Sequence, residues 1–136
     1  MRRPSSIVSG VACMPECGLC TIVLDGRPVN SCLVFAAEAD GAVIETSAAE
    51  NAGDGTLSAL QQAFVDHTAF QCSYCTPGFL MLAVGVLERE PDIGDEELLD
   101  ILSSNLCRCT GYQNIVTSVR AAAAAMRGDA PAGAAG

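Results

Sequence analysis

The 136-residue sequence predicts an α+β fold in which a small β-sheet precedes a four-helix unit. Three observations lead to this prediction. Short β-branched stretches separated by glycine-containing turns fill the early part of the chain. Apolar residues at helical spacing then recur in four later segments. Eight cysteines divide into two quartets, one in each half of the chain.

The sheet is expected to contain three strands, because apolar and β-branched runs flank two turn signals, Asp25-Gly26-Arg27-Pro28 and Asp40-Gly41. The expected elements, in chain order, are strand 21–24, hairpin turn 25–28, strand 29–35 and strand 43–46. The return strand, 29–35, carries Cys32. Residues 47–55 are small and polar and read as a linker, so we place the boundary between a first domain, 1–50, and a second domain at this point.

The second domain, 51–127, is expected to hold four helices. Thr56 is the expected cap of the first helix, which ends near His67. Thr76 is the expected cap of the second, with Pro77 at its first helical position. Pro91 stops that second helix, since proline cannot continue the hydrogen-bond ladder. The third covers 95–102, and the fourth includes Ile115, Val116 and Val119. The tail, 128–136, is alanine, glycine and proline and is expected to be disordered.

The cysteines of the second domain form a C-x2-C pair, Cys72 and Cys75, and a C-x-C pair, Cys107 and Cys109. Each pair lies between two expected helices, so both loops can close on one site from the same end of the bundle. Four converging thiolates bind either structural zinc or a [2Fe–2S] cluster. Because a C-x-C pair is unusual in zinc sites, this spacing favours the [2Fe–2S] cluster.

The first quartet has the spacing C-x3-C-x2-C-x11-C and comprises Cys13, Cys17, Cys20 and Cys32. This is one residue short of the C-x4-C-x2-C run that cradles a [2Fe–2S] cluster in plant-type ferredoxins. Zinc stays open here too. Proline and glycine between these cysteines favour an irregular loop whose backbone N–H groups turn inward toward the sulfurs.

Composition and the absence of certain motifs argue against several classes of function. The net charge of −9 argues against nucleic acid as a partner. No stretch approaches the roughly 20 apolar residues needed to span a bilayer. Without a convincing export signal, a cytoplasmic location is expected, where thiols stay reduced and cysteine clusters more often bind metal. No nucleophile–base set, carboxylate pair or phosphate loop stands out, so no substrate chemistry is expected on this chain alone.

Four motifs carry a resemblance to one family. They are Cys17-Gly18-Leu19-Cys20-Thr21, the run from Asp25 to Cys32, Gln71-Cys72-Ser73-Tyr74-Cys75-Thr76-Pro77-Gly78, and the run from Asn105 to Tyr112. In combination they resemble the small iron–sulfur subunit of molybdenum hydroxylases, the family of xanthine dehydrogenase, aerobic carbon monoxide dehydrogenase and aldehyde oxidoreductases. The resemblance runs from about Cys13 to Val119.

The resemblance implies an electron-transfer role. It implies two [2Fe–2S] clusters, a large partner subunit with molybdopterin and a medium partner subunit with FAD. Electrons would pass from molybdenum through both clusters to the flavin. Carried over by motif, one cluster is bound by Cys72, Cys75, Cys107 and Cys109. The flavin-side cluster is bound by Cys13, Cys17, Cys20 and Cys32 of a ferredoxin-like β-grasp domain. Gln71 and Cys109 match positions that lie against the pterin. Tyr74 and Phe79 flank the Cys72–Cys75 loop in the sequence and are expected to pack around the cluster that this loop binds.

Two departures from the family shape the expectation for the first domain. Only twelve residues precede Cys13, whereas the family has a β-hairpin and a covering helix there. The first loop is also one residue short. We therefore expect a truncated β-grasp with an uncovered apolar face and an absent or labile N-terminal cluster.

Three alternatives to the electron-transfer subunit stay open: a remnant that holds only the C-terminal cluster, a zinc-stapled interaction module, and a free-standing carrier or redox sensor.

Overall fold

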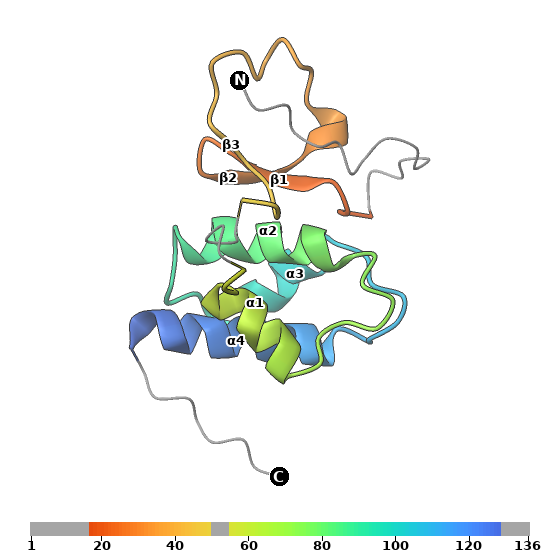
Figure 1. The fold of residues 1–136 in the computed structure, drawn as a ribbon, viewed down its shortest axis with the longest axis vertical. Helices are drawn as coiled ribbons and strands as arrows, with labels where there is room; N and C mark the ends of the chain where they lie inside the picture. The colour runs from red at the N-terminus through yellow and green to blue at the C-terminus, as the bar shows by residue number, and fades with distance from the viewer. Residues whose placement is uncertain (1–16, 50–54, 129–136) are drawn as a thin grey trace.

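The structure, a computed structural model, describes residues 17–49 and 55–128. As predicted, it is α+β: a three-stranded sheet lies at one end and four helices form the other (Figure 1). Within the described residues, no helix has the length and apolar character that a membrane crossing would need. Cys13 and nearly all of the predicted tail lie outside the described residues, and the division into domains 1–50 and 51–127 stays a prediction.

The sheet has the strand order β2-β1-β3 and is antiparallel throughout. Its strands are β1 (Thr21–Leu24), β2 (Arg27–Asn30) and β3 (Ile44–Glu45). Leu24 pairs with Arg27, so the hairpin turn is only two residues, Asp25 and Gly26, at φ 48° and 75°. Two successive positive φ values are typical of a tight hairpin turn that matches the twist of its strands.

The return strand is shorter than predicted, and Cys32 does not lie on it. The strand ends at Asn30, and Cys32 sits in a single 3-10 turn, η1 (Ser31–Leu33). The Ser31 N–H still donates to the Cys20 carbonyl at 3.2 Å, but the Val34 N–H then turns back to the Ser31 carbonyl at 3.3 Å. After Asn30, a local turn therefore replaces the hydrogen bonds between β1 and the predicted return strand. Strand β3 is likewise two residues long rather than four.

All four predicted helices are present, and the third has its predicted bounds. They are α1 (Ala59–Asp66), α2 (Thr76–Leu87), α3 (Asp95–Leu102) and α4 (Gln113–Arg127). Ser58, not Thr56, caps α1, because Ser58 and Gln61 form a reciprocal capping box. Cys75, not Thr76, is the N-cap of α2, so that Thr76 is the first residue of the helix; α2 ends at Leu87, before Pro91 is reached.

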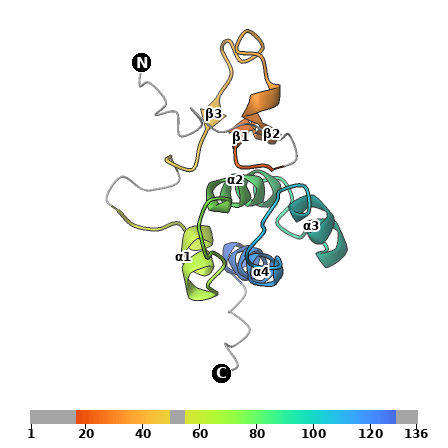
Figure 2. The same ribbon diagram turned by 90° about the vertical axis from the view of Figure 1, so that its right-hand side faces the viewer.

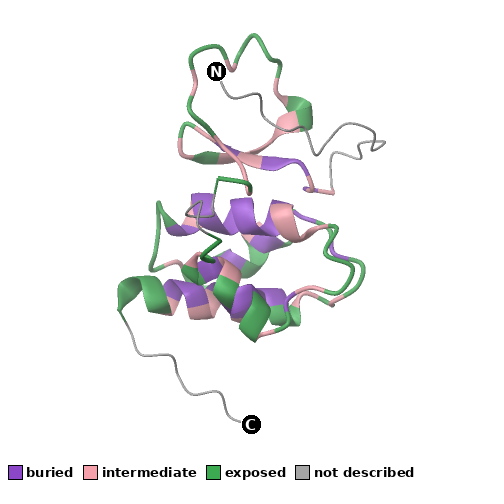
Figure 3. Ribbon diagram, in the orientation of Figure 1, coloured by how far each residue is buried: buried purple, intermediate pink, exposed green. Residues whose placement is uncertain are grey.

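Helix α2 is the centre of the molecule. The sheet covers one of its sides, and α1, α3 and α4 lie on the others (Figure 2). Nine of its twelve residues are buried, as expected for a helix that is apolar all round (Figure 3). A side chain at Gly78 would collide with the Gly18 carbonyl, and a Cβ at Gly85 would lie 2.8 Å from Pro28 Cδ. Two glycines on the same face of α2, about two turns apart, thus let the sheet unit approach the helix closely.

The hydrophobic core belongs almost entirely to the helices. Among the described residues, Val23 is the single member of the core cluster that comes from the sheet unit, residues 17–49. Several large apolar side chains of that unit are exposed instead: Leu33, Phe35, Val43 and Ile44. Phe35 reaches 75% exposure. The described part of the sheet unit therefore leaves large apolar side chains exposed to solvent.

Candidate metal centre

The two cysteine loops of the helical unit lie side by side at one end of the bundle (Figure 1). One loop joins α1 to α2 and the other joins α3 to α4. The Gln71 side-chain amide donates to the Cys109 carbonyl at 3.2 Å, and the Asn114 amide donates to the Thr68 carbonyl at 3.2 Å. Residues far apart in the sequence thus hold the loops together, as the helix order predicted.

The four sulfurs of these loops meet in two pairs, each with one cysteine from either loop. Cys109 Sγ lies 3.6 Å from Cys72 Sγ. The Cys75 and Cys107 thiols are in hydrogen-bonding contact with each other. Every described cysteine is a free thiol, so none of these contacts is a disulfide. Cys107 is buried and Cys75 half-buried, whereas Cys72 and Cys109 are exposed. The site therefore has a protein-enclosed side and an open side.

Strained backbone accompanies the loops. Thr68, Ser73 and Tyr112 have φ values of 52°, 63° and 68°, in the left-handed region. Each such non-glycine residue costs of the order of 1–3 kcal/mol and persists only where the surroundings hold it. Strain of this kind concentrates at ligand clamps, which supports a binding role for the loops.

Helix dipoles add positive potential at the same place. The Cys72–Cys75 loop leads into the N-terminus of α2, and the Cys107–Cys109 loop leads into the N-terminus of α4. A helix N-terminus carries roughly half a positive charge and stabilises nearby anions. Two N-termini beside four thiols favour thiolates or a group of net negative charge.

The ionisation of the thiols differs between the buried pair and the open pair. For Cys107, burial acts to raise the pKa, but hydrogen bonds from the Thr110 hydroxyl and from the Thr110 and Cys109 backbone outweigh it, and the pKa is lowered. Burial, followed by the hydrogen bond and charge of Cys107, raises the pKa of Cys75 to about 12. The Cys72 hydrogen bond raises the pKa of Cys109. Cys107 is thus the thiol best prepared to act as an anionic ligand.

The described cysteines of the sheet unit lie at the base of its hairpin. Cys20 immediately precedes β1 and is buried, Cys17 is half-buried, and Cys32 in η1 is exposed. The Ser31 N–H to Cys20 carbonyl bond brings the Cys32 turn beside the Cys17–Cys20 loop. Cys13, the fourth predicted member, lies outside the described residues.

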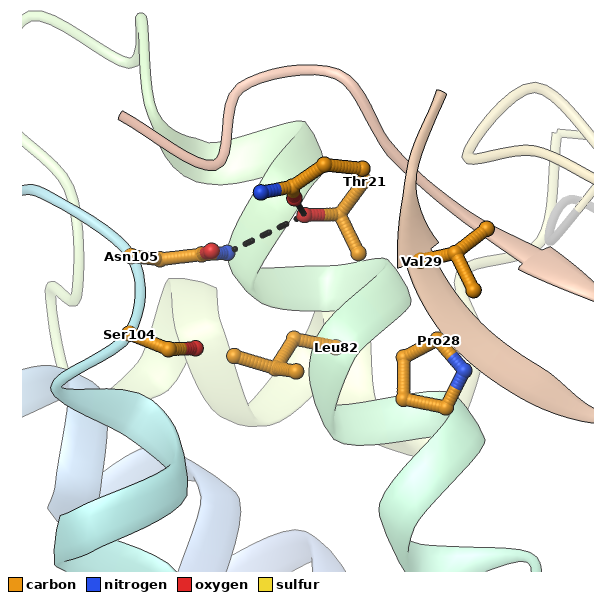
Figure 4. A pocket seen from close by; sticks show the side chains of 7 residues that line it. Thr21, Pro28, Val29, Leu82, Ser104 and Asn105 are labelled. Atoms are coloured by element: carbon orange, nitrogen blue, oxygen red, sulfur yellow. Dashed lines mark hydrogen bonds between the residues drawn. The ribbon is translucent and has the colours of Figure 1, made fainter. Parts of the chain in front are cut away.

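The loops of the two quartets are hydrogen-bonded to each other. The Leu106 N–H donates to the Cys17 carbonyl at 3.1 Å. Next to it, buried Asn105 donates from Nδ2 to Thr21 Oγ1 at 3.4 Å, across a cavity of about 170 Å³ (Figure 4). Since Cys107 follows directly after Leu106, a single hydrogen bond and a few covalent bonds connect one quartet to the other.

Comparison with known proteins assigns the chain to a family. Residues 44–120, more than half of the chain, match the family model described as "[2Fe-2S] binding domain". The chain belongs to this family. It is 54% identical over 103 residues to the nicotine 6-hydroxylase small subunit of Paenarthrobacter nicotinovorans, covering 76% of this chain and 61% of that protein.

Two further relatives agree. The xanthine dehydrogenase iron-sulfur-binding subunit of Escherichia coli O157:H7 is 46% identical over 109 residues, covering 79% of this chain and 68% of that subunit. The structure of quinoline 2-oxidoreductase from Pseudomonas putida 86 aligns with a TM-score of 0.78 at 41% identity, covering 88% of this chain and 76% of that chain. The aligned part of the chain thus spans about three fifths of the nicotine 6-hydroxylase small subunit and about two thirds of the xanthine dehydrogenase subunit.

The residues present fit a [2Fe–2S] cluster. Such a cluster takes four thiolates, two on each iron, and the helical unit offers two thiol pairs. Thr76 Oγ1, in the residue after Cys75, is buried and has no hydrogen-bond partner among the described residues. A buried hydroxyl without a partner is costly, and a sulfur-rich anionic group at this position would supply an acceptor.

Three residues at the site carry contacts that sequence reasoning did not assign to them. Thr110 contacts the Cys107 sulfur, the Tyr112 hydroxyl accepts from the Cys107 N–H at 3.1 Å, and Asn105 joins the two quartets' loops. All lie within the motif that runs from Asn105 to Tyr112, so their position was a signal, but their partners depend on tertiary contacts. Tyr74, expected to pack around the site, is 54% exposed; Phe79 is fully buried.

Proposed function

We propose that this chain is the iron–sulfur electron-transfer subunit of a molybdenum hydroxylase. In this proposal Cys72, Cys75, Cys107 and Cys109 bind one [2Fe–2S] cluster. A second cluster is bound by Cys13, Cys17, Cys20 and Cys32. When bound, each cluster accepts and releases one electron at a time, so that electrons pass from a molybdopterin centre on a large partner subunit toward FAD on a medium partner subunit. The proposed location of the complex is the cytoplasm.

The pairing of the four helical-unit thiols is the observation that carries this proposal. A tetrahedral zinc with bonds of about 2.3 Å would draw all four sulfurs to within about 3.8 Å of one another. Within residues 17–49 and 55–128, no three His, Cys, Asp or Glu side chains converge in the way a single metal ion requires. The sulfurs instead form two contact pairs, which supports a two-iron cluster over zinc.

The partners are inferred from the relatives and from the open side of the site. The relatives named above are a small subunit and an iron-sulfur-binding subunit, and names of that kind imply larger complexes. Gln71, Cys72 and Cys109 are exposed on the open side. In the proposal this side faces the large subunit, with Gln71 and Cys109 against the pterin. The Gln71 contact with the Cys109 carbonyl would hold that carbonyl in place for docking.

The hydrogen-bonded link between the two quartets supports electron exchange between the two proposed clusters. The Leu106–Cys17 bond and the Asn105–Thr21 contact fix the distance between the two cysteine loops. Electron exchange between clusters requires that distance to be short and constant. In the proposal the backbone from Cys107 to Leu106 and across to Cys17 lies between the clusters.

The proposal is tested by purifying the tagged chain from the organism that encodes it and measuring molybdenum, FAD, iron and acid-labile sulfide. We expect molybdenum and FAD to copurify with larger subunits, and the iron–sulfur absorbance to bleach when a hydroxylase substrate of the complex is added without an acceptor. A Cys75→Ser chain should retain its partners but lose that bleaching by the helical-unit cluster. Zinc without sulfide, or an iron–sulfur chain with no molybdenum-containing partner, would refute it.

A further inference from the structure

The Thr110 hydroxyl occupies a defined position between a candidate ligand and the backbone of the next helix. Its Oγ1 lies 3.0 Å from Cys107 Sγ. The same oxygen accepts a hydrogen bond from the Tyr112 N–H at 3.2 Å. Thr110 itself is half-buried. Both contacts are local to the loop that leads into α4.

These two contacts fix which way the hydroxyl proton points. A threonine hydroxyl has one proton and two lone pairs. The Tyr112 N–H can only donate, so it uses a lone pair of Thr110 Oγ1 and leaves the proton free. The other neighbour is Cys107 Sγ, which as a metal ligand is a thiolate with no proton of its own. The bond must therefore run from the Thr110 hydroxyl to the sulfur.

Tyr112 holds this arrangement rigid. Its hydroxyl accepts a hydrogen bond from the Cys107 N–H at 3.1 Å, while its own N–H binds Thr110. Its ring meets the fully buried Phe79 edge-on, with centroids 6.0 Å apart and an interplanar angle of 76°. Tyr112 thus braces both ends of the Cys107–Thr110 segment against the core. A braced donor keeps the same geometry when the charge on its acceptor changes.

We propose that Thr110 donates a hydrogen bond to the Cys107 thiolate in the loaded site and thereby raises the reduction potential of the helical-unit cluster. Reduction adds negative charge to the cluster and its thiolates, and a donor to sulfur stabilises that added charge. The reduced state gains more than the oxidised state, so the potential rises. Thr110 touches a ligand rather than a substrate and is a positioning residue. This inference rests on the proposed function.

The test is an EPR-monitored redox titration of the full chain, reconstituted anaerobically with iron and sulfide. Thr110→Val keeps the shape of the side chain and removes the hydroxyl, and Thr110→Ser restores a hydroxyl. Thr117→Val is the matched control. It makes the same change of side chain, but the Thr117 hydroxyl donates to the Gln113 carbonyl within α4. Iron and sulfide are measured for each variant, so that loading and potential are separated.

We expect Thr110→Val to weaken reduction of the helical-unit cluster about tenfold, which is a downward shift of about 59 mV for one electron. Thr110→Ser should stay within about twofold of the parent chain, and Thr117→Val should not differ from it. A loaded Thr110→Val cluster with the parent potential would overturn the inference. So would failure of both Thr110→Val and Thr110→Ala to load while Thr110→Ser loads, because the hydroxyl would then be required to build the site.

The two proposals fail differently. If the parent chain binds zinc without sulfide, the proposed function is wrong and no potential exists to be tuned. If the parent chain carries a [2Fe–2S] cluster whose potential is insensitive to the Thr110 hydroxyl, only the tuning role is wrong.

Discussion

The helical unit and the sheet unit build thiol sites by different means. In the helical unit, each cysteine loop is held between two helices, and those helices share a continuous core around α2. In the sheet unit, strands of two to four residues present Cys20 and Cys32 at the ends of a hairpin, and only Val23 reaches the core. The first site is positioned by its own fold, whereas the second depends on the helical unit to which it is attached.

The stability of each thiol site comes from the elements that hold its loops. An isolated two-stranded hairpin is at best marginally stable in water, and it needs further strands or packing against a helix to become stable. Here the sheet is held by its contacts with α2, where Gly78 and Gly85 allow a close approach, and by the Leu106–Cys17 hydrogen bond. Exposed Leu33, Phe35, Val43 and Ile44 show how little of its own apolar surface the unit buries. We therefore expect the N-terminal quartet to hold its cluster less firmly than the helical quartet.

The largest expected effect comes from Cys107→Ser. This change removes a ligand that joins two loops otherwise held by a few hydrogen bonds, so the free energy of unfolding of the loaded chain should fall by about 4 kcal/mol or more. Electron delivery from the molybdenum centre to FAD should stop. Thermal unfolding and turnover with the physiological acceptor measure the two effects.

Cys20→Ser is the comparison variant for the sheet unit. It should leave the helical-unit EPR signal and most of the melting temperature unchanged. Equal destabilisation by the two cysteine changes would show that the two sites are not built as differently as described.

Gly78→Ala tests how the sheet depends on α2. A Cβ at Gly78 would collide with the carbonyl of Gly18, a backbone atom that cannot move aside freely. We expect a loss of about 3 kcal/mol in urea unfolding, at the upper end of overpacking effects. Amide hydrogen exchange should accelerate in β1 and β2 more than in α4.

The control for Gly78→Ala is Gly94→Ala. Nothing lies within 4 Å of a Cβ at Gly94, which caps α3, and the cost there should be about 0.5 kcal/mol. If Gly78→Ala costs no more than Gly94→Ala, the sheet does not rely on close contact with the helix.

Tyr112→Phe tests whether the Tyr112 hydroxyl holds the Cys107 loop in place. The change keeps the ring contact with Phe79 but removes the acceptor of the Cys107 N–H. Loss of one such hydrogen bond should cost about 1 kcal/mol in chemical unfolding. The exposed Tyr74→Phe is the matched control and should cost less. Equal effects would mean that the Tyr112 hydroxyl does not brace the loop.

The smallest effect is expected from Glu97→Ala. Glu97 is exposed in the first turn of α3, away from both quartets. Its replacement should alter the free energy of unfolding by no more than about 0.5 kcal/mol and should leave cluster content unchanged. A larger change in iron content would place α3 inside the region that determines binding.

The sequence predicted the α+β class and the existence of all four described α-helices, because apolar spacing and proline positions are local signals. It also predicted that the Cys72–Cys75 and Cys107–Cys109 loops would meet. Helix ends were less predictable: Ser58 displaced Thr56 as a cap through a reciprocal bond with Gln61. The placement of Cys32 in a turn was missed, since the 29–35 run has strand composition but turns back after Asn30.

The contacts of Thr110, Tyr112 and Asn105 could not be read from spacing. Each depends on a partner fixed by the fold: a neighbouring sulfur, the ring of Phe79, or Thr21 across 84 positions of sequence. The ligand roles of both quartets stay predictions, and Cys13 lies outside the described residues.

The most direct measurement is iron and acid-labile sulfide per chain, combined with the EPR spectrum after dithionite reduction, on anaerobically reconstituted protein. We expect iron and sulfide in equal amounts, about two of each for every loaded quartet. We also expect a rhombic signal that Cys75→Ser removes and Cys20→Ser leaves in place. Zinc without sulfide, or an EPR spectrum and iron content that Cys75→Ser leaves unchanged, would contradict the assignment of a [2Fe–2S] cluster to the helical unit.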